Sequence, residues 1–144
     1  MVNAYSDNYL KNQIDSATKE QLLIMFYDGA IRFIARAIKA ITENNNEQKT
    51  YCINKASAII SELSATLDHK IGEDIAADLA SLYDYMNREL IRANINNNSD
   101  SLAIVTKLLT DLRDTWTEAI QSQNKSAESR SLLSDKVDSF SVSL

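Results

Sequence analysis

The side chains most able to do chemistry in this chain are its one histidine, His69, and its one cysteine, Cys52. A di-iron site in a helical bundle needs two inward-facing Glu-x-x-His pairs, but Thr66 stands three residues before His69. A zinc site needs clustered cysteine and histidine ligands, and one of each is not a cluster. A Ser/His/Asp arrangement would rest entirely on His69, which the sequence pattern places between two helices. We therefore predict no metal, no cofactor and no catalytic residue.

The other reactive groups are better interpreted as structural. Cys52 lies near an expected helix start, where a small core residue is a better interpretation than a reactive thiol. The carboxylates of the second half are interpreted as solvated helix faces and partners of helix dipoles. They are Glu73, Asp74, Asp78, Asp111, Asp114 and Glu118. We predict that the protein is not an enzyme and that its function comes from binding.

The composition excludes several classes of partner and fold. With 15 basic and 20 acidic side chains the chain carries a net charge of −5, which weighs against nucleic-acid binding. No apolar stretch approaches the roughly 20 residues needed to cross a membrane, and the N-terminus lacks a secretory signal pattern. A lone cysteine fits a reducing cytosol. Two glycines and no proline argue against turn-rich β folds and glycine-rich phosphate loops, so long helices remain.

Apolar residues recur at steps of three and four in four segments, which predicts one buried face on each of four helices. The first segment starts at a capping box formed by Thr18 and Gln21. The rows are Leu23, Phe26, Ala30, Phe33, Ala37 and Ile41; Ile53, Ala56, Ile60, Leu63 and Leu67; Ile75, Leu79, Leu82, Met86, Leu90 and Ala93; and Leu102, Val105, Leu109, Leu112, Trp116 and Ala119. Short connections are expected at Gly72 and at asparagine triplets 44–46 and 96–98, where left-handed backbone is tolerated. The expected fold is all-α, an antiparallel up-down-up-down four-helix bundle.

Two segments flank this bundle, which we place at residues 18–122. Residues 1–17 are expected to form a polar N-terminal arm, with apolar anchors at Tyr5, Tyr9, Leu10 and Ile14. Residues 123–144 are expected to form a serine-rich tail that is flexible or disordered, or that holds a short extra helix. The alternative is that the apolar side chains of the tail dock on the bundle. They are Leu132, Leu133, Val137 and Phe140.

A faint internal repeat relates the first and third rows, because Tyr27-Asp28 returns 56 residues later as Tyr83-Asp84. Each copy places its aspartate four residues before an arginine, which is the favourable order for an ion pair within a helix. We expect both tyrosines to face the core and both ion pairs to lie on the surface.

The apolar faces of the first and third helices are wider than a minimal core seam needs. The flanking residues are Leu22, Ile31, Ile34, Ala76, Tyr83 and Ile91. One interpretation is that these residues only thicken the core. The other is that they leave a groove that receives another helix. The anchors of the arm suit either a fold back into such a groove or a reach toward a partner.

Four runs of the sequence carry a resemblance to a known family. They are Tyr9-Leu10-Lys11-Asn12-Gln13-Ile14-Asp15-Ser16-Ala17-Thr18, Met25-Phe26-Tyr27-Asp28-Gly29-Ala30-Ile31-Arg32-Phe33, Leu82-Tyr83-Asp84-Tyr85-Met86 and Leu112-Arg113-Asp114-Thr115-Trp116. No single run is specific. Their order over roughly residues 5–122 resembles the FliS family, the flagellin-specific export chaperones.

The resemblance implies a function that composition and spacing do not show. Such chaperones are small cytosolic helical bundles that bind the C-terminal segment of newly made flagellin. They prevent its premature polymerisation and deliver it to the flagellar type III export apparatus. The flagellin segment becomes helical along grooves of the bundle, and the family's arm covers part of the groove through positions that match Tyr9 and Ile14.

The resemblance thus implies a protein of the bacterial cytosol whose partners are flagellin and the export apparatus. The partner-binding residues are expected in the arm: Tyr5, Tyr9, Leu10 and Ile14. A co-chaperone or regulator, and a homodimer formed without client, stay open as further partners. From a different class, the alternative is a self-assembling helical adaptor or structural protein without a flagellin client.

Overall fold

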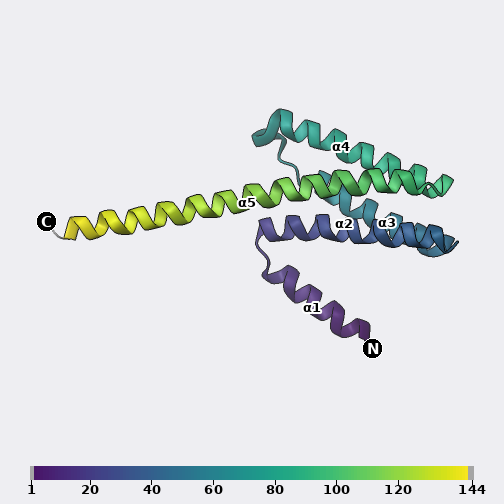
Figure 1. Ribbon diagram of the computed structural model, residues 1–144, viewed down its shortest axis with the longest axis horizontal. Coiled ribbons are helices and arrows are strands. Elements are labelled where there is room, and N and C mark those ends of the chain that lie inside the picture. Colours follow the sequence, from purple (N-terminus) through teal and green to yellow (C-terminus); the bar gives the residue numbers. More distant parts are fainter. Residues whose placement is uncertain (1, 143–144) are drawn as a thin grey trace. The chain divides into compact units, whose positions relative to one another are not determined.

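Five helices make up the computed structural model, which describes the backbone of residues 2–142 and the side chains of residues 7–70 and 72–134 (Figure 1). They are α1 (Val2–Ser16), α2 (Lys19–Thr42), α3 (Asn46–Ala65), α4 (His69–Asn96) and α5 (Ser99–Val142). No strand occurs in the described backbone, which confirms the all-α class. The chain divides into two compact units, Met1–Arg113 and Asp114–Leu144.

The helix starts follow the local sequence. The backbone N–H of Gln21 donates to Thr18 Oγ1 at 3.1 Å, and the N–H of Thr18 donates to Gln21 Oε1 at 3.0 Å. The predicted capping box is therefore confirmed. Asn45 caps α3 by accepting from the backbone of Gln48, and the Asn98 side chain accepts from Asp100 at the start of α5.

The asparagine triplets make the turns that the sequence predicted for them. Asn44 has φ 56° and Asn97 has φ 51°, so each takes the left-handed backbone that asparagine tolerates better than most residues. The central connection differs from the prediction. There the residue with positive φ is Glu73, at 22°, and not Gly72. Glu73 bends α4 after its first turn. His69 is the first residue of α4, so the prediction that it lies in a loop between helices is wrong.

One apolar core lies among α2, α3, α4 and the first part of α5, residues 99–113, which together we call the bundle. Its large, fully buried side chains are Tyr27, Ile34, Cys52, Ile60, Leu63, Met86, Leu90, Leu102, Val105 and Leu109. The interpretation of Cys52 as a core residue is confirmed. Ile75, predicted in the core row, is exposed, and it lies two residues after the bend at Glu73.

Helix packing in the bundle is clearest for α2 on α3 and for α3 on α4. Thr50, early in α3, donates to the Asn94 side chain near the end of α4. Ser57, further along α3, donates to Asn87, which lies earlier in α4. These two contacts run in opposite chain directions, so α3 and α4 are antiparallel. The up-down-up-down order of the whole bundle stays a prediction.

A tyrosine pair joins α2 to α4 in the core. The hydroxyls of Tyr27 and Tyr83 share a hydrogen bond, which explains why the sequence repeats this residue in both helices. Burial raises the pKa of Tyr83 far above its ordinary value, and the bond to Tyr27 and that neighbour's charge add to the rise. The expected ion pair within α2 is replaced by one across helices, since Asp28 Oδ1 lies 2.5 Å from Arg113 Nε.

Lys49 is a charged side chain buried at the junction of α3 and α4. Its ammonium group donates to the backbone carbonyl of Asn94 at 2.8 Å and to Asn97 Oδ1 at 2.5 Å. Carbonyls at a helix C-terminus lack partners within the helix and carry partial negative charge. Lys49 therefore closes the end of α4 and fixes the turn that follows it.

The C-terminal segment differs from the predicted tail. A disordered segment or a separate short helix was expected from residue 123, but α5 continues as one helix to Val142. Every described side chain of residues 121–134 is exposed. Leu132 and Leu133 are 64% and 62% exposed, and docking of the tail on the bundle stays a prediction. The side chains of Val137 and Phe140 lie outside the described residues.

Candidate functional site

An apolar groove lies between α1 and the outer face of α2. Its volume is about 320 Å³. α1 supplies part of its wall, α2 supplies most of it, and Ile59 of α3 closes it. The lining residues are Leu10, Gln13, Ile14, Leu22, Met25, Phe26, Asp28, Gly29, Arg32, Phe33 and Ile59. The two helices meet at the link of Ala17 and Thr18 and diverge from it (Figure 1).

The α2 wall of the groove is a row of residues beside the core row. Tyr27, Ala30, Ile34 and Ala37 are buried in the core at steps of three and four. A second row lies one residue before the core row in the chain, has the same spacing and lines the groove: Leu22, Phe26, Gly29 and Phe33. Adjacent residues of a helix are about 100° apart, so α2 presents two apolar faces side by side. The sequence placed Phe26 and Phe33 in the core row, and this was wrong, since both are only half-buried.

The α1 wall comes from the arm residues that the sequence singled out. Leu10 and Ile14 line the groove and are still 45% and 40% exposed. Tyr9 lies outside the lining and is 67% exposed, and its hydroxyl accepts a hydrogen bond from Gln13 Nε2 at 3.3 Å. The side chain of Tyr5 is outside the described residues. The structure therefore brings Leu10 and Ile14 together at the groove and separates Tyr9 from them.

Gly29 is at the floor of the groove, where α2 approaches α3. A Cβ atom at this position would meet Ile59 Cδ1 at 3.4 Å, the close end of ordinary van der Waals contact. Glycine within a helix costs about 1 kcal/mol relative to alanine, and the close approach of α3 gives a physical reason for Gly29 at this position. Its lack of a side chain leaves Ile59 accessible as a further apolar surface of the groove. No sequence signal identified Ile59 itself, because its contact with Gly29 depends on how α2 and α3 pack.

A pair of aromatic residues, Phe33 of α2 and Tyr51 of α3, continues the apolar surface from α2 onto α3. Phe33 meets Tyr51 edge to face, with ring centroids 6.4 Å apart. Arg36 lies over the Phe33 ring and Lys55 over the Tyr51 ring, at 5.3 and 5.5 Å from the centroids. Aromatic rings with cationic groups over them can contact apolar side chains of a partner, and the cationic groups present positive charge to the same partner.

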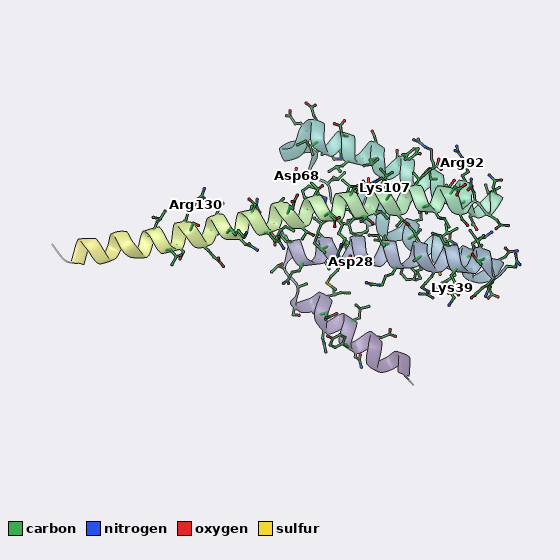
Figure 2. All side chains as sticks on the ribbon, in the orientation of Figure 1. Asp28, Lys39, Asp68, Arg92, Lys107 and Arg130 are labelled. Carbon is green, nitrogen blue, oxygen red and sulfur yellow. The ribbon has the colours of Figure 1, made fainter. Side chains whose placement is uncertain are left out.

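The polar side chains of the groove are few. Asp28, labelled on α2 in Figure 2, is held by Arg113, and Gln13 and Arg32 are the other polar lining residues. Among the residues whose side chains the structure describes, no three of His, Cys, Asp and Glu lie together as metal ligands would. The groove is therefore suited to non-covalent binding of an apolar or amphipathic segment.

The six flanking residues split between the two interpretations. Ile34, Ala76 and Tyr83 are buried and thicken the core. Leu22 lines the groove, Ile31 is half-buried, and Ile91 is exposed. The extra apolar width of α2 thus serves both the core and the groove, whereas that of α4 serves mainly the core.

Comparison with known proteins gives consistent matches. The model of the family described as flagellar protein FliS matches residues 1–123. The flagellar secretion chaperone FliS of Bacillus subtilis is 41% identical, over 81% of this chain and 86% of that protein. Its counterpart in Escherichia coli is 31% identical, over 83% of this chain and 88% of that protein.

A solved structure shares the fold. It is described as a flagellar chaperone from bacteria, with a TM-score of 0.69 and 18% sequence identity, over 85% of this chain and 99% of that one. At this identity the similarity concerns the fold alone. No helix in the described part of the chain has the length and apolar character of a membrane span.

Proposed function

The chain belongs to the flagellar protein FliS family, and from this membership we propose that it binds the C-terminal segment of flagellin and delivers it to the flagellar export apparatus. Members of the family are flagellar secretion chaperones, and the protein is accordingly a chaperone in flagellar export and not an enzyme. It acts in the cytosol, where it keeps flagellin from polymerising before export.

The observation that carries this proposal is the groove of about 320 Å³ between α1 and α2. Its lining on α2 runs from Leu22 to Phe33 and is mostly apolar, and Ile59 of α3 adds to it. A client that folds as it binds loses conformational entropy, typically 2–5 kcal/mol or more, and needs a long apolar surface to offset this cost. Helix-in-groove binding, with client side chains spaced at three and four residues, suits such a surface.

In this proposal the arm, α1, is a removable cover of the groove. Leu10 and Ile14 lie at the groove, yet each keeps nearly half of its surface exposed, so α1 gains little from this contact. A weakly held cover lowers the fraction of binding-competent protein, and the apparent affinity for a client falls by the same factor. It also reduces the apolar surface open to unwanted partners.

The direct test is titration of the full chain with a peptide of the flagellin C-terminal segment. We expect saturable one-to-one binding by calorimetry and a gain of peptide helicity by circular dichroism. A peptide with the same composition in scrambled order serves as the control. Absence of binding, together with a fixed homo-oligomer in light scattering, would instead support the self-assembling adaptor.

Loss of the arm's anchors is expected to strengthen client binding. The double variant Leu10→Ala/Ile14→Ala uncovers the groove, and the peptide dissociation constant should fall by up to about tenfold. Helix content should stay nearly unchanged, since both residues lie outside the core. Tyr9→Ala is the matched control, because Tyr9 lies on the same helix but outside the groove, and it should change the constant less than about twofold. Weaker peptide binding by the double variant would show that the arm holds the client instead of covering its site.

A further inference from the structure

Three cationic side chains lie where the groove meets the aromatic pair of Phe33 and Tyr51. Arg36 is over the Phe33 ring and Lys55 is over the Tyr51 ring, at 5.3 and 5.5 Å from the ring centroids. Arg32 lines the groove itself. All three side chains are exposed within the unit Met1–Arg113. We call Arg32, Arg36 and Lys55 the cationic rim.

The packing of α2 on α3 brings the three cations together. Phe33 meets Tyr51, whereas Gly29, one turn earlier on α2, faces Ile59, two turns later on α3. These two contacts run in opposite chain directions, and Lys55 lies one turn from both Tyr51 and Ile59. The two arginines of the rim are also one turn apart, a rise of about 6 Å along α2. The cations therefore border one stretch of apolar surface.

The cationic rim has no acidic partner within the first unit. Among the described side chains of that unit, no carboxylate forms an ion pair with any of the three cations. The usual partner of Arg32 within a helix would be Asp28, four residues earlier, but Asp28 is held by Arg113. Lys39, on the same helix, does pair with Glu43. The fold thus leaves positive charge at the groove that it balances elsewhere.

This positive charge contrasts with the acidic character of the chain. The whole chain has a net charge of −5, whereas residues 19–65, which include α2 and α3, carry six basic and five acidic side chains. Cations beside an apolar surface favour a partner that brings both apolar and acidic groups. They also disfavour a partner whose cations would face them. The rim can therefore discriminate between segments of similar hydrophobicity.

We propose that the cationic rim selects the segment that the groove accepts, an amphipathic helix with acidic side chains one turn beyond its apolar residues. The inference rests on the proposed function, since it concerns the same groove and the same flagellin client. A helix whose apolar side chains contact Phe26 and Phe33 would bring its next turn to Arg36 and Lys55. Exposed ion pairs are individually weak, so the rim contributes more to the choice of segment than to total affinity.

Two designed peptides separate the effect of charge from apolar binding. Each has about 20 residues with leucine at steps of three and four, and they differ only in carrying glutamate or glutamine beside the leucines. In calorimetric titrations of the full chain at about 20 mM salt, the glutamate peptide should bind about fivefold more tightly. The ratio of the two dissociation constants should approach one at about 500 mM salt, because dissolved ions screen exposed charges.

The double variant Arg36→Gln/Lys55→Gln should reduce this preference to about twofold or less. Both residues lie outside the groove lining, so the glutamine peptide should bind as it does to the parent chain. Lys70→Gln/Lys107→Gln is the matched control, since both lysines are exposed, lie outside the lining and change the net charge by the same amount. The control should keep the preference, and thermal unfolding should stay cooperative in both double variants.

Equal affinity for the two peptides at low salt would overturn the proposal. A preference that survives Arg36→Gln/Lys55→Gln, or that the control loses to the same extent, would overturn it as well. Binding of neither peptide would also do so, because the groove would then not accept an amphipathic helix. A flagellin peptide that fails to bind, while the charge preference is observed, would contradict the proposed function alone.

Discussion

Replacing Phe26 and Phe33 together by alanine is expected to weaken binding of a flagellin C-terminal peptide about 100-fold or more. Both side chains line the groove from α2 and are half-buried, so each combines a large apolar surface with access for a partner. Aromatic anchors in the middle of an interface typically cost 2 kcal/mol or more each when truncated. Two such losses convert to at least this change in the dissociation constant. Calorimetric titration of the variant would measure it directly.

The effect must be separated from a loss of folding. Phe26 and Phe33 lie beside the core row and not within it, so thermal unfolding should remain cooperative. Tyr85→Ala is a suitable control, since Tyr85 is an exposed aromatic residue of α4 that does not line the groove. It should leave the peptide dissociation constant within about twofold. A double variant that is folded and binds the peptide as the parent chain does would show that the client uses another surface.

The largest expected loss of stability comes from Leu90→Ala. Leu90 is fully buried in α4, and its truncation removes apolar contacts and leaves a cavity among the packed helices. The free energy of unfolding should fall by about 2–5 kcal/mol. For a chain of this size each kcal/mol corresponds to roughly 2–4 °C, so the melting temperature should fall by about 5–15 °C. Chemical denaturation followed by circular dichroism would give the free energy of unfolding, and thermal unfolding followed in the same way would give the melting temperature.

The neighbouring residue supplies the control. Ile91 is next in the chain, equally apolar and 59% exposed, so Ile91→Ala should change the free energy of unfolding by less than about 0.5 kcal/mol. The two variants change neighbouring apolar residues of the same helix, so the main difference between them is the burial of the side chain that is removed. Equal losses of unfolding free energy in the two variants would contradict the burial of Leu90 in the core. A large loss in Ile91→Ala alone would show that α4 packs through the face that carries Ile91.

Features that depend on a few neighbouring residues were predictable from the sequence. The Thr18–Gln21 capping box needs only a hydroxyl and an amide three residues apart. The left-handed turns at Asn44 and Asn97 need only a residue type that tolerates them. The apolar spacing of α3 was sufficient to identify Ile53, Ala56, Ile60 and Leu63 as buried, because these residues recur at steps of three and four along one face of the helix.

Features that depend on which helix meets which were not predictable in the same way. On α2, two apolar rows differ by one residue, so spacing alone could not decide that Tyr27 faces the core and Phe26 the groove. That choice is made by α1 and α3, which flank the groove through Ile14 and Ile59. The bond between Tyr27 and Tyr83 likewise needs two helices that are far apart in sequence.

The arm and the C-terminal segment show the limits of composition as a guide. Polar, serine-rich sequence predicted disorder after residue 123, whereas the structure continues α5 to Val142. Serine is only a moderate helix former, so composition weighed against the helix that the structure describes there. In the arm, Leu10 and Ile14 were distinguished from Tyr9 only once the position of α1 against α2 was known.

The contacts of Lys49 bear on how the bundle responds to salt. Most charged side chains on a protein surface are paired, if at all, with other charges, and dissolved ions weaken these attractions. Both hydrogen-bond partners of Lys49 are neutral amide oxygens, the Asn94 carbonyl and the Asn97 side chain, and the lysine is buried beside them. Counter-ions have little access to such a buried contact, and neither partner of the ammonium group carries a full opposite charge. The junction of α3 and α4 should therefore hold as firmly at high ionic strength as in dilute buffer, whatever happens to the ion pairs on the surface around it.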